Sequence, residues 1–162
     1  MTHAGPLVFG YGSLASATSG ARTVIQGYRR VWGVAMDNSV DLPGYKYFAD
    51  PRTGDRPHVM VAFLDLVEDP QASVDGVLLP VDDFAALDRR ERNYRRREIQ
   101  PGIHAYFGTP EARARFAQGP TVVASSYFDI VREPTDLPVL ELRRIDLDAG
   151  GSASPASRSR EP

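Results

Sequence analysis

A short apolar run that ends in a glycine-bracketed turn, Val8-Phe9-Gly10-Tyr11-Gly12-Ser13-Leu14, constrains the fold more than any other stretch of the chain. The apolar residues predict a strand, and the two glycines predict a sharp turn directly after it. Glycine has no Cβ, so the backbone there can adopt positive φ and its N–H groups stay uncovered. Uncovered N–H groups commonly bind a carboxylate or a polarised carbonyl. The sequence therefore predicts a ligand-binding turn after the first strand.

Length and composition limit the class of protein. With 162 residues, of which 42% are hydrophobic, the chain can bury one core, so we expect a single domain over residues 1–148. Residues 149–162 are mostly Gly, Ser, Ala, Pro and Arg, a composition that predicts a disordered tail. The sequence has neither an apolar run of about eighteen residues nor a secretory leader pattern, so we expect a cytoplasmic protein that does not enter a membrane.

The net charge and the numbers of cysteines and histidines argue against several kinds of partner and site. The net charge of −2 argues against nucleic acid and anionic membranes as partners. The sequence contains no cysteine, which excludes a disulfide framework, a thiolate metal site and a cysteine nucleophile. The three histidines, His3, His58 and His104, do not have the spacing of metal ligands. We therefore expect no metal site.

Strand patterns dominate the chain, and two helices interrupt them. β-Branched and aromatic residues predict one long strand, or two joined by a bend, over 24–36. Further strands are expected at 7–12, 59–67, 74–81, 94–100, 103–107, 122–131 and 137–145. Capping residues predict helices over 82–92 and 109–119. Residues 41–57, rich in Pro and Gly, predict a long surface loop, whose aromatic side chains either cover a site or anchor the loop.

The first predicted helix carries the second informative pattern. Positions 84, 87, 88 and 91 share one face, because they are spaced by three, four and seven residues. Glu91 therefore falls on the same stripe as Phe84 and Leu87, at the end of the helix. A carboxylate that loses hydration there has a raised pKa, which suits proton transfer near neutral pH. The alternative, that Glu91 pairs with a neighbouring arginine on a solvated face, stays open.

Two segments together resemble the signatures of the γ-glutamylcyclotransferase-like superfamily. Residues 9–14, Phe-Gly-Tyr-Gly-Ser-Leu, are similar to its YGSL signature. Its second signature is a V-x-G strand before a helix that ends in L-D-x-x-E, with a tyrosine and an arginine soon after. The chain matches it with Val-Asp-Gly at 74–76, Leu-Asp-Arg-Arg-Glu at 87–91 and Tyr-Arg at 94–95. The two signatures occur in the family's order, and the resemblance covers about residues 7–131.

The resemblance implies a fold, a reaction and a set of site residues. The implied fold is mixed α+β, a small closed β-barrel flanked by two or more short helices. The implied reaction, shared with γ-glutamylamine cyclotransferases, converts a γ-glutamyl amide into 5-oxoproline and a free amine or amino acid, without metal or cofactor. Glu91 matches the catalytic acid/base. The positions that match substrate-binding residues are Tyr11, Gly12, Ser13 and Leu14 of the turn, and Tyr127 of the late strand.

The chemistry of this reaction fits the residue types. The substrate's α-amine attacks its own γ-carbonyl, and such intramolecular attack can lower the barrier by on the order of 7–11 kcal/mol. One carboxylate of raised pKa can take a proton from the amine and return it to the leaving nitrogen. The turn can bind either the α-carboxylate or the oxyanion at the γ-carbonyl. Arg92 follows Glu91 where the family commonly has glycine, so the identity of the leaving amine stays open, as does the oligomeric state.

Other functions fit parts of the sequence. Residues 10–15 also satisfy the G-x-G-x-x-G/A motif of a dinucleotide-binding oxidoreductase, but no apolar helical stripe follows them. Six arginines over 89–97 suggest a nucleic-acid surface, yet those on a strand alternate between its faces. Ser13 lacks the G-x-S-x-G elbow of a hydrolase, and Asn38 either lines the pocket or holds a turn. A non-catalytic domain that binds a small γ-glutamyl-like ligand remains the main alternative to an enzyme.

Overall fold

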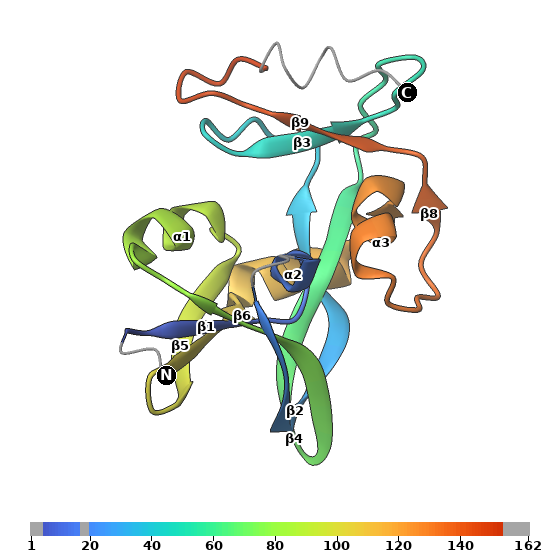
Figure 1. Cartoon of the computed structure of the whole chain (residues 1–162). Coiled ribbons are helices and arrows are strands. Elements are labelled where there is room, and N and C mark those ends of the chain that lie inside the picture. The colour runs from blue at the N-terminus through green and yellow to red at the C-terminus, as the bar shows by residue number, and fades with distance from the viewer. Residues whose placement is uncertain (1–4, 17–19, 154–162) are drawn as a thin grey trace. The chain divides into compact units, whose positions relative to one another are not determined.

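The computed structural model describes residues 5–16 and 20–153 (Figure 1). The chain divides into two compact units. The first comprises Met1–Val34 and Phe63–Ala114, and the second comprises Ala35–Ala62 and Arg115–Pro162. Three elements contribute residues to both units: strands β2 (Ala21–Asp37) and β4 (Met60–Pro80), and helix α2 (Pro110–Gln118).

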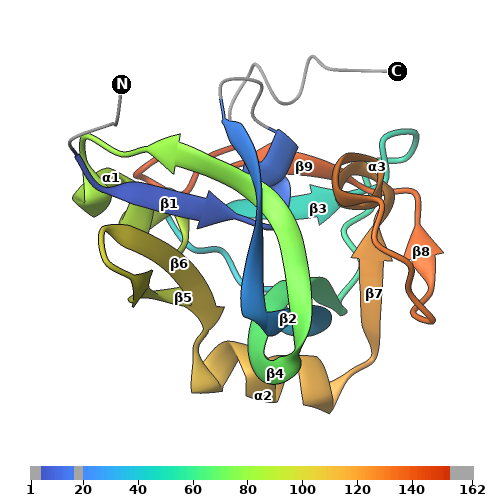
Figure 2. The same ribbon diagram turned by 60° about the horizontal axis from the view of Figure 1, so that its bottom comes forward.

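Four strands of the first unit follow one another in the order β5-β6-β1-β4 (Figure 2). Besides β4, they are β1 (Leu7–Gly10), β5 (Tyr94–Gln100) and β6 (Ile103–Gly108). β1 is antiparallel to the C-terminal part of β4, with Gly10 opposite Val77, and it is parallel to β6. β2 pairs with β4 outside this order. The apolar run of β1 is buried, with Val8 and Phe9 each 1% exposed, and burial of such side chains stabilises by about 1.5–3 kcal/mol each.

Short helical segments connect these strands. The 3-10 helix η1 (Ser13–Ser16) follows β1, and α1 (Phe84–Arg90) follows β4. Asp83 caps α1, because its Oδ1 accepts the N–H of Ala86 at 3.2 Å. The Thr109 hydroxyl accepts the N–H of Ala112 at 3.1 Å at the start of α2. Both caps confirm the helix starts that the sequence predicts.

The second unit contains a parallel set of strands and an antiparallel pair. β7 (Thr121–Ala124) is parallel both to the first residues of β4 and to β8 (Val139–Leu140). β3 (Lys46–Ala49) and β9 (Arg143–Asp146) form the antiparallel pair and run side by side in Figure 1. Helix α3 (Ser125–Val131) follows β7 directly.

The expected mixed α+β class is confirmed by these elements, whereas the closed barrel stays a prediction. The long strand over 24–36 and the hairpin of 94–100 with 103–107 are also confirmed. The break expected between 59–67 and 74–81 is wrong, because β4 continues through Pro70. Pairing with the 17-residue β2 keeps this backbone extended where local sequence favours a turn.

Three further expectations for the second unit are wrong in detail. The strand expected over 122–131 ends at Ala124, and the following residues form α3. The loop expected over 41–57 contains β3, which forms because β9 pairs with it from about a hundred residues away. The single edge strand expected over 137–145 is divided into β8 and β9. The errors at β3, β8 and β9 share a cause, because pairing with other strands decided what local residue preference did not.

The predicted disordered tail over 149–162 lies mostly outside the described residues. Its first residues, 149–153, turn back so that Ala153 forms an isolated β-bridge with Leu147. The prediction of a single domain over 1–148 stays a prediction. Within the described part of the chain, none of the helices is both long enough and apolar enough to span a membrane.

Candidate functional site

The glycine turn after β1 is shaped by close packing. A Cβ on Gly10 would lie 2.7 Å from the Cβ of Leu14, so only glycine lets η1 fold back over the end of β1. Gly10 does not adopt the positive φ that we expected. Glycine is required at this position because a side chain would have no room there. The carbonyl of Gly12 accepts the N–H of Ala15 at 2.9 Å, which closes the helical turn.

The two segments that resemble family signatures meet at this turn. Gly76 of β4 lies against β1, and a Cβ there would be 2.3 Å from the carbonyl oxygen of Gly10 and 2.8 Å from the ring of Phe9. The glycine of the V-x-G segment is therefore the residue that allows β4 to approach the turn. Sequence reasoning placed both glycines in signatures but did not predict that they touch.

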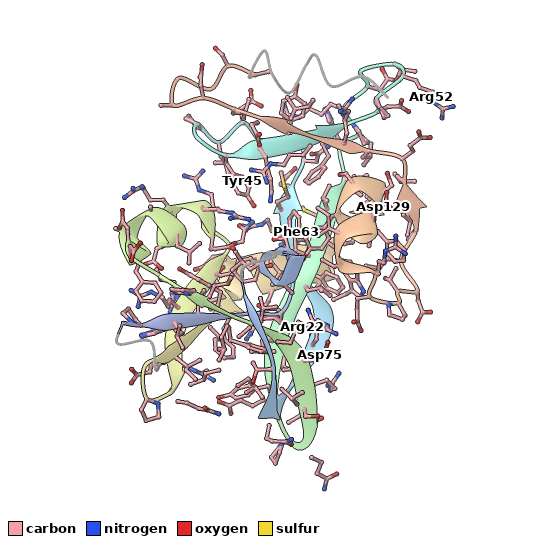
Figure 3. All side chains as sticks on the ribbon, viewed as in Figure 1. Arg22, Tyr45, Arg52, Phe63, Asp75 and Asp129 are labelled. Atoms are coloured by element: carbon pink, nitrogen blue, oxygen red, sulfur yellow. The ribbon has the colours of Figure 1, made fainter. Side chains whose placement is uncertain are left out.

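Two hydrogen bonds hold Tyr11 in place. The Tyr11 hydroxyl donates to the carbonyl of Tyr106 on β6 at 2.5 Å, and the Tyr11 side chain is buried. Arg30 of β2 donates to the carbonyl of Tyr11 at 3.2 Å and to the carbonyl of Asp75 at 3.0 Å. Asp75 also forms an ion pair with Arg22 at 3.2 Å, and both are labelled in Figure 3. The turn is thus fixed to β2, β4 and β6.

Helix α1 presents the face that the sequence predicts. Phe84, Leu87, Asp88 and Glu91 are half-buried, while the other residues of α1 and Arg92 are exposed. Glu91 is the C-cap of the helix, with φ −94° and ψ 52°, and its N–H donates to the carbonyl of Leu87 at 2.9 Å. The Glu91 carbonyl accepts the N–H of Tyr94 at 3.0 Å, which starts β5. Both ends of this residue are therefore held by backbone bonds.

Asp88, one turn before Glu91, is held by two donors. Arg96 of β5 donates to its two carboxylate oxygens at 3.0 and 3.3 Å, and the Tyr106 hydroxyl donates to Oδ1 at 2.6 Å. The Arg96 hydrogen bonds hold the pKa of Asp88 below its usual value, and the Tyr106 bond adds to this. Burial, the hydrogen bond to Asp88 and the charges of Asp88 and Glu91 raise the pKa of Tyr106. Asp88 is thus fixed as a carboxylate and Tyr106 as a neutral phenol.

These contacts form a chain from the turn to α1: Tyr11 binds the backbone of Tyr106, and the side chain of Tyr106 binds Asp88. Sequence reasoning missed Tyr106, Arg30 and Arg96. The only signal for Tyr106 was its place in a predicted strand, which gives its face but not its partners. The structure therefore connects the turn with the helix that ends at Glu91.

A cavity of about 410 Å³ lies between the turn, the C-terminal end of β4 and α1. Its apolar wall includes Val8, Leu14, Leu79, Val81, Ala86 and Leu87. The charged side chains of Asp82, Asp83 and Arg90 also line it. Of the predicted site residues, Leu14 lines this cavity.

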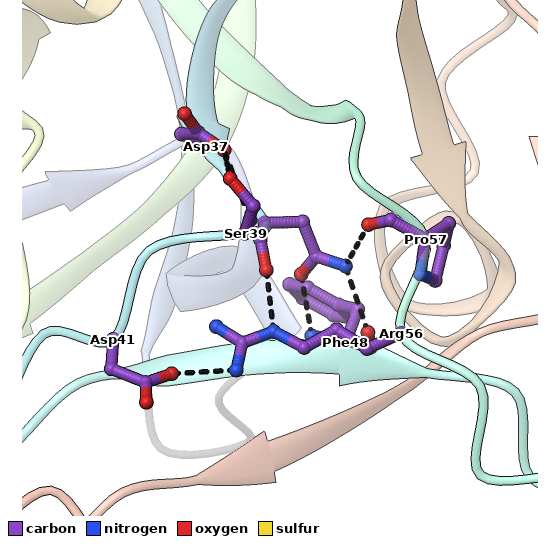
Figure 4. Close-up of polar contacts among 7 residues, drawn as sticks. Asp37, Ser39, Asp41, Phe48, Arg56 and Pro57 are labelled. Carbon is purple, nitrogen blue, oxygen red and sulfur yellow. Dashed lines mark hydrogen bonds and ion pairs between the residues drawn. The ribbon is translucent and has the colours of Figure 1, made fainter.

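Two other sequence candidates belong to the second unit. Tyr127 lies on helix α3 and not on the late strand that we expected. It belongs to the second unit, whereas the turn belongs to the first. Asn38 is fully buried and satisfies three backbone groups: its amide donates to the carbonyls of Phe48 and Pro57, both at 2.9 Å, and its oxygen accepts the N–H of Phe48 at 2.7 Å (Figure 4). Arg56 donates to the Asn38 carbonyl at 2.6 Å. Asn38 therefore holds the 41–57 segment and has a structural role.

The described residues contain no group of three or more His, Cys, Asp or Glu side chains that could hold a metal ion.

Comparison with known proteins gives limited similarity. No protein-family model matches the chain, and no curated protein matches it. A solved structure of an uncharacterized protein from Homo sapiens is similar with 17% identity and a TM-score of 0.38, covering 84% of this chain and 94% of that chain. A solved structure described as a gamma-glutamyl cyclotransferase is similar with 16% identity and a TM-score of 0.38, at the same coverage.

Proposed function

We propose that this chain is a γ-glutamylcyclotransferase-type enzyme, which cyclises a γ-glutamyl amide to 5-oxoproline and releases an amine. One observation carries the proposal. The two segments that resemble the family's signatures lie together in the first unit, and Tyr106 links the turn at Tyr11 to the helix that ends at Glu91. The turn and the helix, about eighty residues apart in the sequence, are thereby held next to the same cavity.

In the proposed reaction the nitrogen of the substrate's α-amine forms a bond to its γ-carbonyl carbon. The backbone of Gly12 to Leu14 binds the α-carboxylate or the developing oxyanion. The bond between the γ-carbon and the amide nitrogen then breaks, and the departing nitrogen takes up a proton. The products are 5-oxoproline and the free amine, so no other co-reactant is required.

Glu91 is the proposed proton carrier. It removes the proton that the attacking amine loses and returns one to the leaving nitrogen. Asp88 is a poor candidate for this role, because Arg96 and Tyr106 hold it as a carboxylate with a lowered pKa. In this proposal Asp88 has a structural role and Glu91 the catalytic one.

The test is mass-spectrometric detection of 5-oxoproline after incubation with a panel of γ-glutamyl amides. We expect Glu91→Gln to lower the rate by at least about a hundredfold, the lower range for loss of a general acid/base. Glu111→Gln is the matched control, since Glu111 is exposed on α2 and outside the site. Full turnover by a folded Glu91→Gln protein would contradict the mechanism. Binding of γ-glutamyl compounds by the wild type without product would support the non-catalytic alternative.

A further inference from the structure

Two neighbouring faces of helix α1 have different contacts, one with the cavity and one with β5 and β6. Asp83, Ala86, Leu87 and Arg90 face the cavity, at spacings of three, four and seven residues. Phe84, Asp88 and Glu91 lie on the adjoining face, and Asp88 there contacts β5 and β6. Leu87 belongs to both faces. The cavity therefore adjoins the face that carries Glu91 without including its side chain.

The other wall of the cavity is formed by the turn. Leu14, the last residue of the YGSL-like segment, lines it together with Val8 of β1. The cavity is thus lined by the last residue of the turn and by Leu87 of α1, whose face also carries Glu91. A substrate bound between the turn and Glu91 would have this cavity next to it.

The residues that line the cavity favour one chemical class of ligand. Its wall is mainly apolar, and its volume of about 410 Å³ is within the range of small-molecule sites, roughly 300–1,000 Å³. Its charged groups are Asp82, Asp83 and Arg90, all exposed, so carboxylates outnumber cations two to one. The net negative charge of these groups would repel an anionic ligand, whereas an uncharged apolar group would pack against the apolar wall.

We propose that this cavity is the leaving-group subsite and that it takes a neutral apolar amine. The inference rests on the proposed function and narrows it, because it makes the substrates γ-glutamyl conjugates of apolar amines that lack a carboxylate. The released amine leaves the cavity carrying the proton that Glu91 returns to its nitrogen. Each methylene of the substrate that is buried against the apolar wall should raise kcat/KM about fourfold, which is the factor that the transfer free energy of a buried CH₂ gives.

Three γ-glutamyl amides test the subsite on the wild-type protein. γ-Glutamyl-isopentylamide and γ-glutamyl-leucine have the same apolar body and differ by one carboxylate, and γ-glutamyl-methylamide lacks the body. We expect kcat/KM for the isopentylamide to exceed that for the methylamide by at least about thirtyfold, and to exceed that for the leucine conjugate by at least about tenfold. Equal values within either pair, or a preference for the leucine conjugate, would overturn the inference.

Two alanines of α1 give a matched pair of variants. Ala86 and Ala85 are both exposed neighbours on the helix, but only Ala86 lines the cavity. We expect Ala86→Phe to fill the cavity and lower the isopentylamide-to-methylamide ratio of kcat/KM at least tenfold, and Ala85→Phe to leave that ratio as in the wild type. An equal change of the ratio in both variants, or in neither, would refute the subsite.

The failure of this inference is distinguishable from the failure of the proposed function. If the methylamide yields 5-oxoproline and the apolar body gives no advantage, the cyclotransferase proposal stands and the subsite is wrong. If no γ-glutamyl amide yields 5-oxoproline while the folded protein is intact by circular dichroism, the proposed function is wrong and the subsite falls with it.

Discussion

At the scale of single residues, the contact between Gly76 and Gly10 gives the sharpest prediction. A methyl group on Gly76 would overlap the Gly10 carbonyl at 2.3 Å, and backbone atoms there have little room to move. We expect Gly76→Ala to lower the free energy of unfolding by about 1–3 kcal/mol, the usual cost of overpacking. Urea unfolding followed by circular dichroism measures it.

Gly33→Ala is the control for that change. Its Cβ would lie 3.5 Å from the nearest heavy atom, an ordinary contact, and Gly33 also lies in a strand. We expect its free energy of unfolding to differ from the wild type by no more than about 0.5 kcal/mol. If both variants are equally stable, the two signature segments do not pack as described.

At the scale of elements, α1 combines a face that the sequence predicts with partners that it does not. The spacing of 84, 87, 88 and 91 identifies the half-buried side of the helix, because helical periodicity is local. Tyr106 and Arg96 reach Asp88 only through the β5–β6 hairpin, so their roles depend on pairing between strands. The sequence predicts the helix at 110–118 from its Thr109 cap. It misses the helix at 125–131, whose N-cap, Ala124, has no side-chain cap hydrogen bond.

The contacts of Asp88 predict how stability depends on pH. Its folded-state pKa is lowered, so its contribution is present above the unfolded value of about 3.9 and is lost as the pH falls through the folded value. We expect Asp88→Asn to be less stable than the wild type at pH 7, and the difference to shrink as the pH falls below about 3.9. The difference at pH 7 should stay below about 1 kcal/mol, because the Asp88 side chain is 42% exposed and water screens its ion pair.

Urea unfolding across the pH range measures this difference, and Asp82→Asn is the control. Asp82 is exposed and, in the part of the chain that the structure describes, makes no side-chain hydrogen bond or ion pair. Its substitution should leave the pH dependence as in the wild type. A pH-independent effect of Asp88→Asn would mean that Arg96 and Tyr106 do not stabilise the charged form.

At the scale of the whole molecule, the sequence predicts one domain, and the structure resolves two compact units that share β2, β4 and α2. Strand continuity cannot be read from local residue types, since Pro70 and its acidic neighbours favour a turn within β4. The sharing of β2 and β4 means that unfolding of either unit removes part of strands that the other also needs. We therefore expect the two units to unfold together.

The single tryptophan makes this expectation testable, because Trp32 lies in the first unit and the Asn38 contacts lie in the second. Asn38→Ala leaves the N–H of Phe48 and the carbonyls of Phe48 and Pro57 without their amide partner, which should cost about 2–4 kcal/mol. We expect the urea midpoint of Trp32 fluorescence to fall accordingly, although no atom of the first unit is changed. Val40→Ala, at a 44% exposed position nearby, should leave the midpoint in place. An unchanged Trp32 midpoint in Asn38→Ala, with loss of hydrogen-exchange protection in β3 and β9, would instead show two units that unfold independently.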